Sequence, residues 1–510
     1  MLISKFKKVV FSVVLVLLIL QVPVVFDSSA QTSEKVTYYV ATNGDDANTG
    51  TISQPWRTIQ HAADTMVAGD TVLIRSGVYN EQIRTVSDGN AADGYIVFSA
   101  YQDETPVIDG TGVETGNNGF VIENSYIKIL GLEIRNWNDN GITSWNVGYL
   151  EISDCKIHDV GGGIGLFDGT HDFSVNRVEM YSVTMGGFDA SPAEGADCYN
   201  GVINDCIVHT GRDHEQNCDG FGLGHGEEHN FVFNRCEVYD VFDGFDMSAR
   251  DTQINSCTSH DNWNTGYKIW EDNVTLTNCL GYHNEGNNLQ LPWNEEPGTV
   301  TLRNCDFVDS QVDNIWVQNP ADRLRIYNCI LAGGDNVGLD FEQLGTGTYQ
   351  GDYNIFHNDN PDRAIVVRDH EPEFSLDMIT AGDWTKYSGQ DQHSLVCTDP
   401  SSQLFKNLAN WDIHIKQGSI AIDAGTPNNA PKVDFDGLSR PQGGGYDIGA
   451  YEYTSSSLPN GKTSGNSSDS TQVEGETPFW MQWWLWATVT VVILALAGAA
   501  IYLLKMRKKA

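Results

Sequence analysis

The dominant pattern in the chain is a four-residue phrase of alternating apolar and variable positions. Each copy opens with Gly or Asn and carries apolar side chains at its second and fourth positions. This is the period of a strand that buries one face. The nine copies are GFVI, GIGL, GFDA, GFGL, GFDM, GYKI, NLQL, NIWV and GLDF, beginning at residues 119, 163, 187, 220, 244, 266, 288, 314 and 338. We therefore predict one such strand in every repeat.

A second phrase alternates with the first and holds a small apolar residue, most often cysteine, as in EISDCKIHD and TLRNCDFVD. Its eight intervals cover 197 residues, a mean of about 24.6, and a fixed period of this size indicates a solenoid. No repeat contains a ten-residue stretch of helical period, so the prediction is an all-β, right-handed parallel β-helix with coils about 4.8 Å apart. The equivalent positions are Leu132, Cys155, Val178, Cys206, Cys236, Cys257, Cys279, Cys305 and Cys329.

The repeat also changes how the ten cysteines are interpreted. One inward cysteine per coil makes a stack of small buried side chains, and Leu132 and Val178 in the same slot favour packing over covalent bonding. Adjacent coils lie close enough for disulfides, so that alternative stays open. Cys198, Cys218 and Cys397 fall outside the stack, and a Cys198–Cys218 bridge also remains an alternative.

The two ends of the chain carry targeting patterns. A basic start at residues 5–8, the apolar run Val9–Val25 and small residues up to Ala30 predict a signal peptide cleaved after Ala30, with a retained anchor as the alternative. Phe479–Leu504 is long enough to cross a bilayer, is rich in Trp and is followed by basic residues. We therefore expect an exported protein held at the cell surface by a single C-terminal span, with an extracellular body.

An amphipathic helix predicted over Trp56–Met66 would cover the open N-terminal end of the solenoid. The expected organisation is a signal peptide (1–30), an N-terminal cap with the first coils (31–120), a regular β-helix carrying the site (121–345), C-terminal coils with an anchor-type segment (346–453), a flexible linker (454–478), a transmembrane helix (479–504) and a basic cytoplasmic tail (505–510).

Charge narrows the choice of partner. The chain has 68 acidic and 30 basic side chains, a formal net charge of −38. Binding of nucleic acid requires clustered Lys and Arg, so this class of partner is not expected. An acidic polymer would also be repelled unless a cation lay between it and the protein.

The outward position of each strand supplies the candidate chemistry. Read in coil order it gives Asp189, Gly222, Asp246, Lys268, Gln290, Trp316 and Asp340. Asp219 and Asp243 directly precede two of the phrases, so with Asp246 they place three carboxylates in neighbouring coils. Crowded carboxylates favour a Ca²⁺ ion, although Asp-Gly pairs also simply form turns. Beside a cation, Lys268 could act as a general base; the alternative is a surface lysine paired with Asp246.

These motifs resemble the family 9 pectate lyases, calcium-dependent parallel β-helices that cleave polyuronates. The likeness covers roughly residues 38–345 and is sharpest over Cys218–Asp272, in CDGFGLGHG, FDGFDMSAR and TGYKIWED. It implies that Asp219, Asp243 and Asp246 bind calcium and that Lys268 is the base. Phe242 departs from the pattern, since the family has a further Asp there. Residues 421–453 (AIDAGTP, DFDGLSRP, YDIGAYEY) also resemble a terminal segment of exported, surface-anchored β-helix proteins.

The resemblance implies a lyase that cleaves an acidic, pectate-like polysaccharide by β-elimination with Ca²⁺ as cofactor, and we expect a monomer. The expected substrate contacts are Arg212 to a sugar carboxylate, Trp270 or Trp316 stacked on a ring, and Gln290 beside Lys268. Two alternatives stay open. One is a non-catalytic surface protein that binds glycans or mediates adhesion along its coil faces. The other is a glycoside hydrolase with Asp243 and Asp246 as its carboxylate pair.

Overall fold

The computed structural model describes residues 35–454, apart from residues 115, 193–195, 213–216, 225–227, 295–297, 320–321, 335, 346 and 371. The predicted signal peptide, the predicted transmembrane helix at 479–504 and the basic tail lie outside the described residues, as does all of the predicted linker beyond Thr454. Within the described part, no helix has the length and apolar character needed to cross a membrane.

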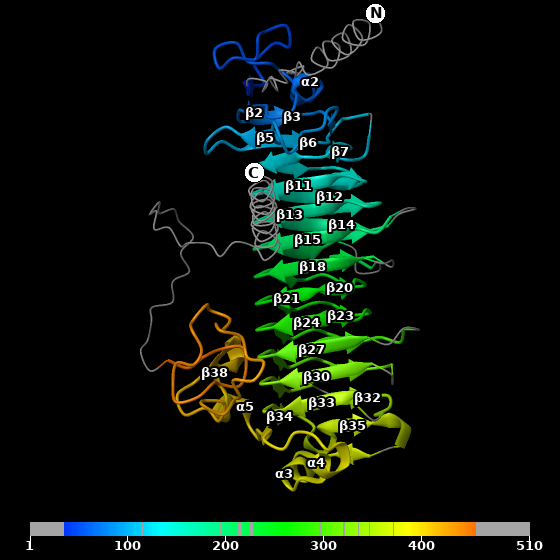
Figure 1. The fold of residues 1–510 in the computed structure, drawn as a ribbon, viewed down its shortest axis with the longest axis vertical. Coiled ribbons are helices and arrows are strands. Elements are labelled where there is room, and N and C mark those ends of the chain that lie inside the picture. Colours follow the sequence, from blue (N-terminus) through cyan, green and yellow to red (C-terminus); the bar gives the residue numbers. More distant parts are fainter. Residues whose placement is uncertain are drawn as a thin grey trace, which may run out of the picture. The chain divides into compact units, whose positions relative to one another are not determined.

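The described chain is a right-handed parallel β-helix whose strands stack coil upon coil, as the repeat predicted (Figure 1). One wall is a 13-stranded parallel sheet. Its strands are β1 (Thr37–Val40), β2 (Thr71–Ile74), β5 (Ile96–Ala100), β8 (Ile127–Leu130), β11 (Gly148–Ser153), β13 (His171–Asn176), β15 (Tyr199–Asn204), β18 (His229–Asn234), β21 (Gln253–Asn255), β24 (Val274–Thr277), β27 (Thr299–Arg303), β30 (Arg323–Tyr327) and β33 (Tyr349–Asp352).

The other walls belong to a 24-stranded sheet made of two rows. The long strands β12 (Lys156–Phe167) and β14 (Glu179–Ser191) take part in both rows. The first row also contains β3 (Gly77–Tyr79), β6 (Pro106–Asp109), β9 (Glu133–Arg135), β16 (Ile207–Gly211), β19 (Glu237–Tyr239), β22 (Thr258–His260), β25 (Leu280–Tyr282), β28 (Asp306–Val308), β31 (Ile330–Ala332), β34 (Ile355–His357) and β37 (Leu395–Val396). The second row, called the site row below, contains β4 (Ile83–Arg84), β7 (Phe120–Ile122), β10 (Asn140–Trp145), β17 (Asp219–Leu223), β20 (Phe245–Met247), β23 (Tyr267–Ile269), β26 (Leu289–Leu291), β29 (Asp313–Val317), β32 (Val337–Phe341), β35 (Ile365–Val367) and β36 (Glu373–Phe374).

The alternation predicted for the site row is confirmed by its register. Phe221 pairs with Phe245, and Phe245 with Tyr267, and all three side chains point into the core. Their ring centroids lie 5.0 Å apart from coil to coil, in a stacked arrangement. Because side chains alternate along a strand, the residue directly after each aromatic faces outward: Gly222, Asp246 and Lys268.

The cysteine prediction is confirmed as packing. All ten cysteines are buried and free, and Leu132 and Val178 are buried in the same core. Cys198 and Cys218 are both free rather than bridged; the Cys198 thiol contacts the carbonyl of Leu166 and the Cys218 thiol that of Val183.

Helices occur only near the two ends of the described part. The helix predicted over Trp56–Met66 is present as α2 (Ile59–Thr65), capped by the hydroxyl of Thr58 and lying near the N-terminal end of the coils (Figure 1). The other helices are α3 (Leu376–Thr380), α4 (Asp383–Ser388), α5 (Pro400–Gln403) and the 3-10 turns η1 (Pro361–Arg363), η2 (Arg368–His370) and η3 (Leu408–Asn410).

After the last coil the chain folds back along the side of the solenoid and forms the antiparallel pair β38 (Phe405–Asn407) and β39 (Asp412–Ile415). We call residues 397–453 the C-terminal segment. Its apolar side chains cover the outward faces of β25, β28, β31 and β34. Its polar backbone is held by an asparagine ladder on successive coils, in which Asn304 donates to the carbonyls of Asp447 and Gly449 and Asn328 donates to that of Thr426.

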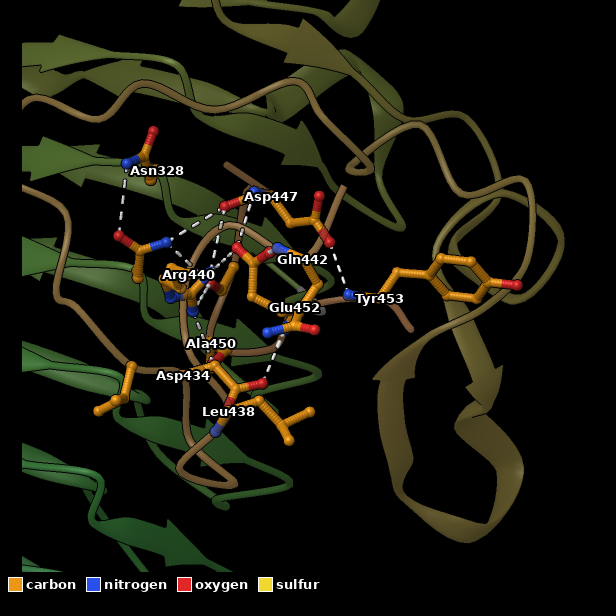
Figure 2. A network of polar contacts seen from close by, with 12 residues as sticks. Asn328, Asp434, Leu438, Arg440, Gln442, Asp447, Ala450, Glu452 and Tyr453 are labelled. Carbon is orange, nitrogen blue, oxygen red and sulfur yellow. Dashed lines mark hydrogen bonds and ion pairs between the residues drawn. The ribbon is translucent and has the colours of Figure 1, made fainter. Parts of the chain in front are cut away.

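A buried ion pair lies at the centre of this contact (Figure 2). The side chains of Arg440 and Glu452 are fully buried and 2.8 Å apart. Arg440 also donates to Asn278 Oδ1 and to the carbonyls of Gly449 and Ala450. The segment is therefore joined to coils more than 100 residues earlier in the sequence.

Candidate active site

The outward column predicted for the site row exists in the structure. Successive strands place its members directly beside one another, in the order Asp189, Gly222, Asp246, Lys268, Gln290, Trp316 and Asp340. Since neighbouring strands lie about 4.8 Å apart, each side chain is within reach of the ones above and below it.

Asp219 and Asp243 join this column from its edge. Asp219 is the first residue of β17, and Asp243 lies in the turn before β20, where its carbonyl accepts a hydrogen bond from Gly220 N at 2.8 Å. One carboxylate oxygen from each of Asp219, Asp243 and Asp246 lies within 4.8 Å of the others. The structure therefore brings together the three carboxylates that the sequence placed in neighbouring coils.

Lys268 completes the group, which we call the Asp–Lys cluster (Asp219, Asp243, Asp246 and Lys268). Its Nζ lies 3.0 Å from Asp243 Oδ2 and 3.1 Å from Asp246 Oδ2. Trp270 borders the cluster, because its Nε1 donates to Asp246 Oδ1 at 2.6 Å and its ring lies 5.2 Å from the Lys268 ammonium. Lys268 is thus held by two charges and an aromatic face.

The remaining carboxylate oxygens differ in how well they are satisfied. Asp243 Oδ1 accepts from Thr265 N and from Asn264 Nδ2, which fixes this fully buried side chain. Asp219 Oδ2 accepts from Asn217 Nδ2 at 2.9 Å. Asp219 Oδ1 is buried and has no hydrogen-bond partner among the described residues.

Burial and crowding change the protonation of the cluster. Burial, reinforced by the charges of Asp243 and Asp246, raises the pKa of Asp219 to about 8. Burial also raises the pKa of Asp243, in spite of the nearby ammonium. For Lys268, burial lowers the pKa, but the two carboxylates outweigh it and the net pKa lies above the usual value. Without a further positive charge, Asp219, Asp243 and Lys268 therefore hold their protons to higher pH than the same groups in water.

These residues fit a divalent cation. Three ionised carboxylates against one ammonium leave two formal negative charges in a half-buried place, and Asp219 Oδ1 lacks a donor. Hard oxygen ligands on rigid strands suit Ca²⁺, which tolerates loose geometry. Asp219, Asp243 and Asp246 are the residues that would hold it.

Comparison with known proteins identifies the fold family. The Pel9A-like right-handed β-helix region matches residues 38–305, which include the whole Asp–Lys cluster. The chain belongs to this Pel9A-like family. The resemblance to family 9 pectate lyases that the coil motifs indicated is thereby confirmed.

Individual relatives match either a short part of the chain or a longer part at low identity. The chain is 43% identical to the uncharacterized protein YwoF of Bacillus subtilis (strain 168) over 76 residues, 15% of this chain and 16% of that protein. It is 26% identical to pectate lyase L of Paenibacillus polymyxa (strain SC2) over 307 residues, 54% of this chain and 64% of the relative. The chain thus spans less than two thirds of either curated relative. The crystal structure of pectate lyase Pel9A aligns with 83% of this chain and 98% of its own, at 15% identity and a TM-score of 0.49.

The other predicted contacts lie at different distances from the cluster. Gln290 is directly beside Lys268 in the column and accepts from the Thr265 hydroxyl at 3.2 Å. Trp316 is the next member and lies beyond the family match, with the Arg368 guanidinium 5.6 Å from its ring. Arg212 faces Asp159 at 3.5 Å and makes no contact with the cluster among the described residues.

Some features of the site were not predicted. Asn217 and Asn264, which hold Asp219 and Asp243, lie in turns where no alternation marks them. A hollow of about 380 Å³ also adjoins the cluster over Gly222, between Asp189 and Asp246, and is called the Gly222 hollow below. Burial raises the pKa of Asp189, on its far side, to about 6. The missing side chain of Gly222, visible in the column, was the one sequence signal for it.

Proposed function

We propose that this Pel9A-like protein is a calcium-dependent polysaccharide lyase that cleaves a polyuronate by β-elimination. The observation that carries the proposal is the position of Lys268. Its ammonium lies 3.0–3.1 Å from two carboxylates of a three-carboxylate group that contains an unsatisfied oxygen. A base next to a cation-binding group is what abstraction of a proton α to a carboxylate requires.

The proposed reaction uses Lys268 as the base. Its neutral Nζ removes the proton from C5 of a uronate, the C5–H electron pair forms a C4=C5 double bond, and the C4–O bond breaks. The leaving oxygen takes up a proton, so that an unsaturated uronide and a new chain end are formed. Asp219, Asp243 and Asp246 would hold a Ca²⁺ ion, which would supply positive charge to the substrate carboxylate.

Lys268 can serve as a base only if its pKa falls. In the structure Asp243 and Asp246 keep that pKa high, because both carboxylates bond the ammonium. A cation bound by Asp243 and Asp246 would compete with the ammonium for the two carboxylates and would repel it, and both effects would lower the pKa of Lys268. Cation binding and activation of the base are therefore linked in this proposal.

The same arrangement answers the charge problem of the whole chain. A protein of net charge −38 repels a polyuronate, and a divalent cation held by Asp219, Asp243 and Asp246 gives the polymer a local positive contact. The substrate partner is accordingly an acidic polysaccharide. Gln290 and Trp270 border Lys268 and are its proposed substrate contacts, with Trp316 one coil further on.

The hydrolase alternative is less favoured. Asp243 and Asp246 bond the same ammonium, whereas an acid and base pair must lie on either side of a glycosidic bond.

For location, we retain the proposal of an exported monomer anchored by residues 479–504, which rests on the sequence pattern alone.

The test is an elimination assay on pectate, alginate and glycosaminoglycans, with and without a chelator, followed by the ultraviolet absorbance of the unsaturated product. We expect activity on a uronate polymer that the chelator abolishes. Lys268→Ala should lower kcat by about 10²–10⁴-fold, the range of a general base, with calcium binding retained. Lys128→Ala, at an ion pair with Glu151 on the opposite sheet, is the matched control. New reducing ends without ultraviolet absorbance would instead favour hydrolysis, and binding without cleavage would favour a glycan-binding protein.

A further inference from the structure

Neither packing nor backbone conformation requires a glycine at position 222. The two nearest glycines along the chain are required by packing: a Cβ at Gly220 would lie 2.2 Å from the Val238 side chain, and a Cβ at Gly224, just after β17, would lie 2.2 Å from Ser191. At Gly222 the nearest atoms to a Cβ would be Asp189 Oδ1 and the Phe188 carbonyl, both at 3.7 Å. The backbone there is not in the left-handed region either. Packing and backbone conformation would both accept a side chain at position 222. The effect of the glycine is therefore on the surface outside the strand, where it leaves a space open.

That space is the Gly222 hollow. Asp189 and Asp246 flank Gly222 in the column, two strand spacings apart, which is roughly 10 Å. The volume of about 380 Å³ falls in the range of about 300–1,000 Å³ typical of small-molecule sites. Asp219 and Asp246 of the Asp–Lys cluster form one side of it. A polymer bound at the cluster therefore passes directly into the hollow.

The lining indicates what kind of sugar fits. Apolar side chains contribute to it, among them Phe167 and the half-exposed Met185. Its charged groups are all acidic, with Asp139 and Asp189 on the side away from Lys268. No lysine or arginine is among the described residues that line it. On the side away from Lys268 and the proposed cation site, a free carboxylate would face Asp139 and Asp189 with no described lysine or arginine beside it, and this arrangement disfavours it there.

We propose that the Gly222 hollow is a subsite for an uncharged sugar residue next to the uronate at the Asp–Lys cluster. This inference rests on the proposed lyase function. Gly222 reserves the space for the ring, and Asp189 accepts a hydrogen bond from a sugar hydroxyl at its far side. Two kinds of residue share this chemistry, a methyl-esterified uronate and a neutral sugar alternating with uronate. Both present apolar C–H or methyl groups to the apolar side chains.

The experiment compares three polymers: fully de-esterified polygalacturonate, its methyl-esterified form, and a polymer alternating galacturonate with a neutral deoxy sugar. We expect the highest kcat/KM on one of the two polymers with uncharged residues, and the comparison between them identifies which. Gly222→Val fills the hollow and should lower kcat/KM on that polymer by about ten-fold or more. Terbium binding at the aspartates should be unchanged. Ser174→Val, an outward position on β13, is the matched control.

Asp189→Asn tests the charge argument separately. It keeps the size of the side chain and removes one negative charge, so relative activity on the de-esterified polymer should rise a few-fold. A wild-type preference for the de-esterified polymer, or a Gly222→Val enzyme unchanged on all three, would overturn the inference while leaving the lyase proposal intact. If the wild type cleaves none of them, calorimetric binding of oligosaccharides decides: loss of binding to the uncharged-residue oligomers in Gly222→Val supports the subsite, and equal binding overturns it.

Discussion

At the scale of single residues, Asp219 links geometry to protonation most directly. Its Oδ1 is buried without a partner among the described residues, and burial with two neighbouring carboxylates raises its pKa to about 8. In the unfolded chain an Asp titrates near 3.9. Between these values the folded protein holds a proton that the unfolded protein has lost, so folding is favoured most at low pH.

The prediction follows from the sign of that shift. In chelator, the contribution of Asp219 to the unfolding free energy is fully present below about pH 4 and is lost as the pH rises through about 8. Calcium should remove this loss, because it stabilises the ionised carboxylate. Denaturant unfolding at a series of pH values measures both effects. Asp219→Asn should flatten the profile in chelator and abolish the calcium effect, whereas Asp64→Asn, at an exposed position on α2, should behave as wild type. Parallel profiles for wild type and Asp219→Asn would contradict the assignment.

Sequence alone could predict the outward column, because a phrase that recurs every 22–33 residues on a parallel coil fixes which side chains are neighbours. It could not predict how Lys268 is held. The bonds of Lys268 to Asp243 and Asp246 depend on rotamers and on turn residues such as Asn264. Phe242, which departs from the family motif, shows the same limit. Its backbone N donates to the carbonyl of Cys218 and continues the pairing between coils, and this bond does not depend on the side chain.

At the scale of elements, one coil was missed between the first and the last of the nine phrases. β10 carries Ile142 in the inward column between Phe120 and Ile164. Its phrase, GITS, has Ser144 where the others have an apolar residue, and Ser144 is buried by bonding the Thr170 hydroxyl at 3.0 Å. A hydrogen bond thus replaces apolar contact there, which a search for apolar alternation does not detect.

A second asparagine ladder, made of the buried residues Asn262, Asn284 and Asn288, positions the strands of the site. Asn284 donates to Ser259 O and Asn288 Oδ1, and its Oδ1 accepts from the backbone and side chain of Asn262. Ser259 in turn donates to the carbonyl of Gly266, just before Lys268 on β23. The ladder therefore fixes the turn from which the site strand starts.

Asn284→Ala leaves several buried polar groups without partners, each of which costs about 1–3 kcal/mol. We expect the free energy of unfolding to fall by about 2–4 kcal/mol, measured by denaturant titration. Asn138→Ala, at an exposed position, should change it by less than about 0.5 kcal/mol. A loss no larger than that of the control would mean that neighbouring groups re-pair or that water replaces the amide.

At the scale of the whole molecule, the C-terminal segment is the feature that sequence periodicity reached least. Its contacts join residues far apart in the chain: Arg440 bonds Asn278 across 162 positions, and Asn304 bonds Asp447 across 143. No local period connects such positions. The asparagines recur once per coil, but only the folded chain shows that their side chains receive a returning backbone.

The Arg440–Glu452 pair makes this attachment testable. Both side chains are fully buried, and Glu452 also accepts from the backbone of Gln442 and Asp447 (Figure 2). Removing one partner of a buried pair leaves an uncompensated charge, which costs about 3–5 kcal/mol. Arg440→Met should therefore open the segment locally, measured as faster hydrogen exchange over residues 420–453 and in β25, β28 and β31.

Arg235→Met breaks an exposed pair with Asp205 and should cost about 0–1 kcal/mol, without local opening. The strands of the Asp–Lys cluster, β17, β20 and β23, lie outside the surface that the segment covers. Any activity measured below the opening transition should therefore survive Arg440→Met. Unchanged exchange would show that apolar contacts alone hold the segment. Loss of activity together with opening would show that the segment supports the site through the coils between them.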